Sequence, residues 1–263
     1  MRNRIYEKNL EALKIKLPDF WEKIEEIRQK TNENTLLKVQ SQVGRNGEDI
    51  VIAYCGDKEY YLSGKYAPEQ MAQREAAKIQ QIDMGTVLVV IGLSDGRVIR
   101  NILEKIKKGV VLFVYEPSIE IFLHTLEHYD ISRFLEEDYT YLIVDDINGT
   151  ELRTVLDTGI AIETISKLEI MVQGNYSILF GKKIKHVLKT IKQSINQLKL
   201  NWNTLRYFEE DSVYNIIRNY KYLNNHYSWN SFKNILPEQV PVIVVAAGPS
   251  LDKNIEQLKE EKG

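Results

Sequence analysis

Apolar positions in the first 66 residues predict two helices followed by a small antiparallel sheet. Leu10, Leu13 and Leu17 recur at helical spacing, and Pro18 begins a second amphipathic helix. Three runs rich in apolar and β-branched residues come next, separated by short polar turns that contain glycine: 35–42, 49–55 and 59–62. We therefore expect a three-stranded β meander and assign 1–66 to an N-terminal part without a reactive cluster of side chains.

From 67 to 180 the pattern changes to continuous apolar runs that alternate with helical stripes. Pro68 opens a helix that we expect to extend to about Ile82. Three buried strands are predicted after it: 87–91, 110–115 and 139–144. Buried runs of this length between helices are typical of a parallel sheet with right-handed crossovers. The predicted fold class is α/β, with a Rossmann-like domain over 67–180.

Helical periodicity continues through 181–236. Apolar residues from Ile184 to Leu205 recur at steps of three and four, which predicts a helix of about six turns with one buried stripe. Further helices are predicted around Val213 to Leu223 and at 229–236, so we interpret this region as a packed helical connector. After it, 237–263 has the pattern of the first β-α unit of a second Rossmann-like domain, with a strand at 242–247 and a helix at 251–261.

Composition and charge narrow the class of protein. The 263 residues include 35 Lys and Arg against 37 Asp and Glu, for a formal net charge of −2. Nucleic-acid-binding domains are usually strongly basic, so we do not expect that partner. The lone Cys55 cannot form an internal disulfide, and no apolar run approaches the ~20 residues of a membrane span. We expect a soluble, cytoplasmic protein that does not enter a membrane.

A turn with two glycines follows the first buried strand of 67–180. In GLSDG, Gly92 and Gly96 flank the entry to a helix, and Glu116 ends the next strand. In doubly wound folds such glycines bring a ligand close to the backbone, and an acid at the second strand binds ribose hydroxyls. The interpretation that we favour is that both glycines only permit a tight turn and close helix packing. Short glycine motifs are weak signals, and Asp95 would oppose a phosphate.

A second turn leads from the predicted strand 242–247 into a helix. Gly248 leaves room for a ligand at the backbone, and Pro249 restricts the turn. Ser250 can cap the helix or bind a phosphate oxygen, while Asp252 suits the helix dipole and equally suits a contact with a sugar or a metal. An ordinary capped turn explains the same residues equally well.

The segment AAGPSLDKNIEQLK resembles the start of the central domain of the motility accessory factor family. These are bacterial flagellin glycosyltransferases, and that domain is named for its similarity to 6-hydroxymethylpterin pyrophosphokinase. Upstream, three further stretches resemble the family's N-terminal domain and connector helices: YYLSGKYAPEQMAQREAAKI, VLVVIGLSDGRVIRNIL with VLFVYEPSIEIF, and NYSILFGKKIKHVL. The resemblance covers most of 60–263. Family members often have a GxGxG-like first turn, where this chain has GLSDG.

The resemblance implies a cytoplasmic enzyme that transfers a nonulosonic acid, of the pseudaminic or legionaminic type, from its CMP-activated form to Ser or Thr of flagellin. Flagellin is then the expected partner, with homo-oligomerisation a further expectation. Gly248, Pro249, Ser250 and Asp252 would belong to the nucleotide-sugar pocket of the full-length enzyme. We expect the catalytic domain to continue beyond Gly263. The chain by itself is then expected to be an inactive structural or acceptor-docking module without a cofactor, whose sequence indicates no catalytic residue.

Two other functions stay open at the level of sequence. A stand-alone Rossmann enzyme of the methyltransferase type would use Gly92, Gly96 and Glu116 to hold its cofactor, and binding of S-adenosylmethionine would distinguish it. A pyrophosphokinase-like enzyme would require Mg²⁺ and a triphosphate, and it predicts phosphorylation of a pterin at the expense of ATP.

Three weaker signals are explained better by solvation or packing. Seven basic residues and no acidic residue lie from Lys182 to Arg206, which is typical of the solvated face of a long helix. His124 and His128 are four residues apart with only Glu127 as a neighbouring acid, so we predict a surface pair and no metal site. The many aromatic residues of the connector are expected to pack between helices.

Overall fold

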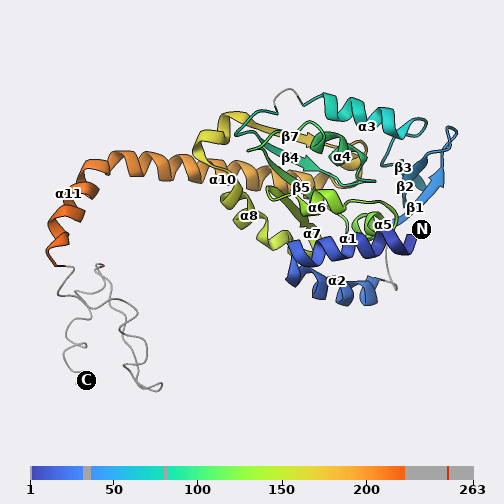
Figure 1. Cartoon of the computed structure of the whole chain (residues 1–263), viewed down its shortest axis with the longest axis horizontal. Helices are drawn as coiled ribbons and strands as arrows, with labels where there is room; N and C mark the ends of the chain where they lie inside the picture. The colour runs from blue at the N-terminus through green and yellow to red at the C-terminus, as the bar shows by residue number, and fades with distance from the viewer. Residues whose placement is uncertain (1, 32–36, 80–81, 223–247, 249–263) are drawn as a thin grey trace, which may run out of the picture. The chain divides into compact units, whose positions relative to one another are not determined.

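The computed structural model describes 2–31, 37–79, 82–222 and residue 248 (Figure 1). By its internal contacts the chain divides into two compact units, Met1–Arg206 and Tyr207–Gly263. The domain boundaries expected after residues 66, 180 and 236 stay predictions. The helices expected at 229–236 and 251–261 and the strand expected at 242–247 lie outside the described residues.

The N-terminal part has the two helices and the meander that its apolar pattern predicts. Helices α1 (Arg2–Lys16) and α2 (Pro18–Thr31) come first, with Pro18 at the first position of α2, where a missing amide proton costs nothing. Strands β1 (Leu37–Val43), β2 (Asp49–Cys55) and β3 (Lys58–Tyr61) then form an antiparallel sheet in the order β1-β2-β3.

The second sheet is parallel and has four strands in the order β6-β5-β4-β7, which confirms the α/β class. Its members are β4 (Val87–Ile91), β5 (Val111–Glu116), β6 (Thr140–Val144) and β7 (Leu168–Val172). The chain moves outward from β4 through β5 to β6, and then returns to the other side of β4 as β7. The strand order therefore reverses at β4, which makes the β4–β7 boundary a topological switch point.

Strand β7 was not predicted from the sequence. It is an edge strand whose second residue is Glu169, and Ile170 is 41% exposed, so the segment has no continuous buried apolar run. A strand with one unpaired edge and a half-buried face does not need the uniformly apolar composition of its central neighbours.

Helices cover both faces of the parallel sheet (Figure 1). Besides α1, α2 and the later helix α10 (Gly181–Tyr207), they include α3 (Pro68–Ala77), α4 (Arg97–Leu103), α5 (Ile119–His128), α6 (Ser132–Glu136), α7 (Asp145–Asn148), α8 (Leu152–Gly159) and α9 (Tyr176–Leu179), with 3-10 turns at Gly149–Glu151 and Ile162–Lys167. The expectation that α3 extends to about Ile82 was wrong. Helix α3 ends at Ala77, where the Lys78 amide donates to the Glu75 carbonyl in a tighter turn, and Ile79 then packs against the core.

Alternate strand residues supply two separate cores, one on each face of the sheet. Leu88 and Val90 of β4 pack with buried side chains of α1, α2, α4 and α5. Val89 and Ile91 pack with buried side chains of α8, α9 and α10 (Gly181–Tyr207). Since successive side chains of a strand point to opposite faces, this alternation is what a sheet buried between two helical layers requires.

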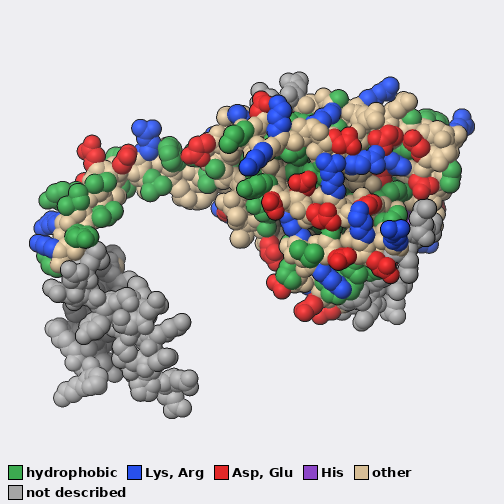
Figure 2. Space-filling model, in the orientation of Figure 1, with side chains coloured by type: hydrophobic (Ala, Val, Ile, Leu, Met, Phe, Trp, Pro, Cys, Tyr) green, Lys and Arg blue, Asp and Glu red, His purple; other side chains and the backbone are tan. Residues whose placement is uncertain are grey.

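The stripe of α10 is buried over only part of the helix. Ile184 and Val187 are buried, whereas Trp202 is 42% and Leu205 is 67% exposed. The prediction of one buried stripe along the whole helix was therefore wrong, because only its first turns pack on the sheet core. Helix α11 (Glu209–Tyr220) has no buried residue, and Figure 2 shows hydrophobic side chains at its surface. Within the described ranges, no helix is both long and apolar enough to cross a membrane.

Candidate functional site at the carboxyl ends of strands β4 and β7

The turn from β4 into α4 has an unusual backbone. Gly92 and Gly96 have φ angles of 103° and 75°, in the region that L side chains rarely adopt. Ser94 lies between them with φ of 52°, and among the described residues it is the one non-glycine with a positive φ. The Gly92 amide donates to the Tyr115 carbonyl at 2.8 Å, which fixes the start of the turn against β5. The turn is tight and firmly held.

A tyrosine from a distant part of the chain fills the space against this turn. A Cβ added to Gly92 would lie 2.7 Å from the ring of Tyr176, which is fully buried. The Tyr176 hydroxyl accepts a hydrogen bond from the Ser94 amide at 2.8 Å and donates one to Glu116 Oε2 at 2.8 Å. We call the set Gly92, Glu116 and Tyr176 the Tyr176 corner.

Glu116 is occupied by bonds within the protein. Its side chain is fully buried, and it accepts hydrogen bonds from the amides of Leu93 at 2.8 Å and Ser118 at 3.0 Å, as well as from the Tyr176 hydroxyl. Burial raises the pKa of Glu116 to about 7, against these hydrogen bonds and the nearby Lys183, which favour the charged form. The geometry favours the tight-turn interpretation of Gly92 and Gly96. A ligand held by these glycines and Glu116 stays a prediction.

A second polar cluster lies at the carboxyl ends of β5 and β6. Lys183 of α10 contacts Asp145 at 2.7 Å and Asp146 at 3.5 Å, and it donates to the carbonyl of Pro117 at 2.8 Å. The Tyr115 hydroxyl donates to Asp145 at 2.6 Å. Burial lowers the pKa of Lys183, but the hydrogen bond and charges of the two aspartates outweigh it and raise the pKa above its ordinary value. This lysine therefore ties α10 to the sheet and is not part of a purely solvated face.

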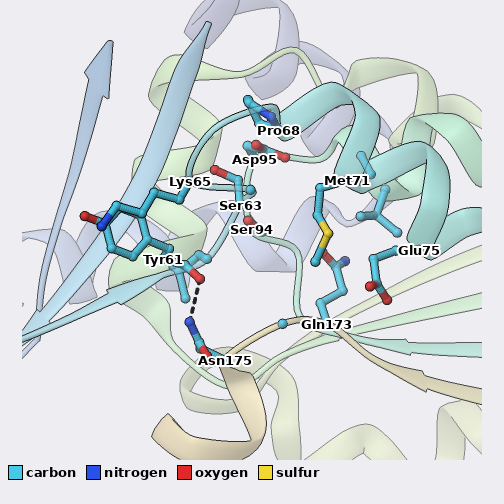
Figure 3. A pocket seen from close by; sticks show the side chains of 15 residues that line it. Tyr61, Ser63, Lys65, Pro68, Met71, Glu75, Ser94, Asp95, Gln173 and Asn175 are labelled. Atoms are coloured by element: carbon cyan, nitrogen blue, oxygen red, sulfur yellow. Dashed lines mark hydrogen bonds between the residues drawn. The ribbon is translucent and has the colours of Figure 1, made fainter. Parts of the chain in front are cut away.

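An open pocket lies on the other side of β4, at the switch point. Its volume is about 240 Å³. Four segments line it: 61–65, starting with the last residue of β3; one side of α3; the chain from the β4 turn into α4, with Ser94, Asp95 and Val98; and 173–175 after β7. Figure 3 shows Ser94 and Asp95 at its centre, with Met71 and Glu75 on the α3 side and Tyr61 on the opposite side. We call this space the switch-point pocket.

The floor of the switch-point pocket contains two buried polar side chains. Ser94 is 1% exposed, and its hydroxyl has no hydrogen-bond partner. The Asp95 carboxylate is paired with Arg97 at 2.5 Å, and a hydrogen bond with Ser63 also favours its charged form. Burial nevertheless raises the pKa of Asp95 above its ordinary value.

The walls of the pocket are held by bonds between segments that are distant in sequence. The Gln173 amide donates to the Gly92 carbonyl at 2.6 Å, and the Asn175 amide donates to the Tyr61 carbonyl at 2.9 Å (Figure 3). On the α3 side, Glu69 pairs with Arg97 at 3.7 Å and also with Arg100, which fastens α3 to α4. The pocket is therefore a preformed feature of the fold.

The remaining predicted site residues are only partly described. Gly248 lies in a half-exposed bend, and Pro249, Ser250 and Asp252 lie outside the described residues. No group of three His, Cys, Asp or Glu side chains suited to a metal ion occurs within the described ranges. His124 and His128 stack with ring centroids 4.2 Å apart, and His124 shares a hydrogen bond of 2.8 Å with Ser41.

Sequence reasoning missed the residues that decide this site. Tyr176 and Gln173 follow a strand that was not predicted, so nothing placed them beside the β4 turn. Ser94 was not predicted to be a site residue, although it lies in the turn GLSDG. The sequence does contain a signal for it, because a non-glycine residue between two glycines in a tight turn is a candidate for a positive φ angle.

Comparison with known proteins finds a likeness in structure. No protein-family model matches the sequence, and no curated protein matches it. Among solved structures, the MAf glycosyltransferase from Magnetospirillum magneticum AMB-1 is similar, with a TM-score of 0.50 and 14% sequence identity over 75% of this chain. The match covers 36% of that chain, so this sequence spans well under half of its solved neighbour. At this identity the likeness establishes the fold.

Proposed function

We propose that this chain is the N-terminal region of a glycosyltransferase of the motility accessory factor type, and that its own α/β domain is an accessory, non-catalytic part. The observation that carries the proposal is the shared fold with the MAf glycosyltransferase of Magnetospirillum. The segment GPSLDKNIEQLK adds to it, because its sequence resembles the start of the family's central domain and this resemblance does not rest on the comparison of folds.

The Tyr176 corner supports a non-catalytic role. A Rossmann-type enzyme holds its cofactor on the glycine turn after the first strand and on an acid after the second. Here the ring of Tyr176 lies against Gly92, and Glu116 accepts three hydrogen bonds inside the protein. Without displacement of Tyr176, a cofactor has neither the space nor the free carboxylate that this mode of binding needs.

The whole protein would transfer a nonulosonic acid from its CMP-activated form to Ser or Thr of flagellin. The region 248–252 would begin the nucleotide-sugar pocket, with Gly248 and Pro249 shaping the turn and Ser250 and Asp252 facing the phosphate and sugar. The exposed apolar side chains of α10 and α11, among them Trp202, support a role in docking flagellin or in homo-oligomer contacts.

A transfer assay tests the catalytic part of the proposal. The protein that carries this sequence in its native cells, purified intact, is incubated with CMP-pseudaminic acid and unmodified flagellin. We expect the intact mass of flagellin to rise by one sugar residue, and we expect Ser250→Ala to slow the transfer. The 263-residue chain alone is expected to leave the flagellin mass unchanged. No transfer by the native protein with either pseudaminic or legionaminic donors would contradict the proposal.

Calorimetry tests the accessory role of the α/β domain. S-adenosylmethionine titrated into the 263-residue chain is expected to give no heat of binding, because Glu116 and the β4 turn are already occupied. Micromolar binding that Glu116→Ala abolishes would instead support a methyltransferase-like enzyme and sink the accessory role.

A further inference from the structure

We propose that the switch-point pocket binds a small neutral polyol of about the size of one monosaccharide. The inference goes beyond the proposed function and does not depend on it, because it concerns only the described residues around β4 and β7. Four independent features support it: the position of the pocket, the state of Ser94, the pairing of its charges, and the chemistry of its walls.

The position is where open α/β sheets place their ligands. When the connections after two adjacent parallel strands leave toward opposite faces of the sheet, a crevice forms between them at the carboxyl ends of the strands. Here Ser94 and Asp95 follow β4, and Gln173 follows β7. The volume of about 240 Å³ lies just below the lower end of the range for drug-sized ligands, roughly 300–1,000 Å³, so the pocket suits one ring and not a dinucleotide.

Ser94 lowers the stability of the folded protein when no ligand is bound. Its φ of 52° is in the region that a non-glycine residue rarely adopts, and its buried hydroxyl has no partner. A buried hydroxyl without a hydrogen bond loses its interaction with water and gains nothing in exchange. Backbone strain and unmet polar groups gather at ligand sites, where the ligand supplies the missing partner. Ser94 is one of the residues that line the pocket, so its buried hydroxyl lies next to the space that a bound molecule would fill.

The pairing of charges in the pocket favours a neutral ligand over an anion. The buried carboxylate Asp95 is neutralised by Arg97, and Glu75 pairs with Lys78 at 2.6 Å. Lys65 is the cation in the lining of the pocket, and its ammonium group lies over the Tyr61 ring at 4.6 Å. A phosphate in this floor would therefore lie next to a carboxylate without a buried cation of its own.

The chemistry of the walls matches a ring that bears hydroxyl groups. Ser94 can both donate and accept, and Asp95 can accept, which suits the O–H groups of a polyol. Other parts of the lining are apolar side chains, among them Met71, Ala72 and Val98. These can pack on the C–H face of a sugar ring, and a few polar groups in an otherwise apolar pocket fix the orientation of a ligand.

The test uses three neutral probes, D-galactose, N-acetyl-D-glucosamine and myo-inositol, with D-glucose 6-phosphate as the anionic probe. Each is titrated into the ¹⁵N-labelled 263-residue chain, and amide shifts are followed by NMR. We expect at least one neutral probe to bind with saturating shifts at the amides of Ser94, Asp95 and Gln173. Ser94→Ala should weaken that binding about tenfold, the effect of one lost hydrogen bond.

Ser194 provides the matched control. Within the described ranges it is the other buried side chain whose hydroxyl lacks a partner, and it lies in α10, away from the lining of the pocket. Ser194→Ala should leave the affinity unchanged. A second variant, Ala72→Leu, fills the pocket from α3 and should abolish binding. A circular-dichroism melt of each variant shows whether it is folded, and Ser94→Ala against Ser194→Ala decides the matter if Ala72→Leu is not.

Three results would overturn the proposal. The first is the absence of saturable shifts at these amides with all three neutral probes. The second is an equal loss of affinity in Ser94→Ala and Ser194→Ala. The third is tighter binding of D-glucose 6-phosphate than of any of the three neutral probes, which would assign the pocket to anions. Since the titration requires no glycosyl transfer, its failure is distinguishable from failure of the proposed function.

Discussion

The two sides of strand β4 differ in how their polar groups are satisfied. On the β5 side, the Tyr176 corner is closed: the Tyr176 ring contacts Gly92, and Glu116 accepts three hydrogen bonds. On the β7 side, the switch-point pocket is open, and the Ser94 hydroxyl in its floor has no partner. The same five-residue turn, 92–96, contributes residues to both sides.

This difference separates a structural use of the Rossmann turn from a binding use. Hydrogen bonds that are complete within the chain stabilise the fold and leave nothing for a ligand. A buried group without a partner lowers stability and is retained most readily where something else binds it. Gly92, the first glycine of the sequence motif, therefore belongs to the closed side, while Ser94 belongs to the open side.

The largest expected effect on stability comes from a substitution at Gly92, on the closed side. Gly92→Ala places a Cβ 2.7 Å from the Tyr176 ring at a φ angle of 103°. Strain of this kind costs about 1–3 kcal/mol, and overpacking a buried ring costs about as much again. We expect the free energy of unfolding, measured by urea denaturation, to fall by about 3–5 kcal/mol.

Gly47→Ala is the control for Gly92→Ala. Gly47 also has a positive φ, 82°, but nothing lies within 4 Å of an added Cβ. Its alanine variant should lose only the backbone contribution, about 1–2 kcal/mol. Equal losses in the two variants would show that Tyr176 does not fill the space beside Gly92 in solution.

The next largest expected effect is the change in stability with pH that Glu116 causes. Its folded pKa of about 7 lies above the ordinary value of 4.5, so between these pH values the folded state holds a proton that the unfolded state has released. Stability from this group is complete below pH 4.5 and is lost as pH rises to about 7, by an amount on the order of 2–3 kcal/mol. Glu116→Gln has no such proton and should lack the loss.

The measurement is urea unfolding of both proteins at pH 5 and pH 8. We expect the stability of Glu116→Gln relative to the unmodified chain to rise by about 2 kcal/mol between the two pH values. Glu104→Gln, at an exposed position of the same domain, should keep a constant difference. A constant difference for Glu116→Gln as well would mean that this carboxyl group is solvated, and the Tyr176 corner would then be open to a ligand.

The sequence predicts the strands and two of the three residues on the closed side, Gly92 and Glu116, but it does not predict the open side. The apolar runs at 87–91 and 110–115 identified the two central strands, β4 and β5, because strands buried on both faces require uniformly apolar residues. The same logic fails for the edge strand β7, which Glu169 interrupts. Without β7 there is no switch point. The pocket and the position of Tyr176 then depend on contacts across more than 80 residues, which no local pattern encodes.

The smallest expected effect is also the sharpest test of the open side. Ser94→Gly removes both the strain of a positive φ and the unpartnered hydroxyl, and it adds the entropy that glycine loses on folding. The first two gains exceed the third, so we expect the free energy of unfolding in urea to rise by about 1 kcal/mol. Ser94→Ala, which removes the hydroxyl but keeps the strain, should lie between the two.

If Ser94→Gly raises the free energy of unfolding, then Ser94 destabilises the folded protein. This is expected of a side chain whose hydroxyl binds a ligand. A loss of 1 kcal/mol or more would instead mean that the hydroxyl is satisfied within the protein. The two sides of β4 would then be alike, both closed by internal hydrogen bonds, and the switch-point pocket would lose the feature that distinguishes it from an ordinary surface hollow.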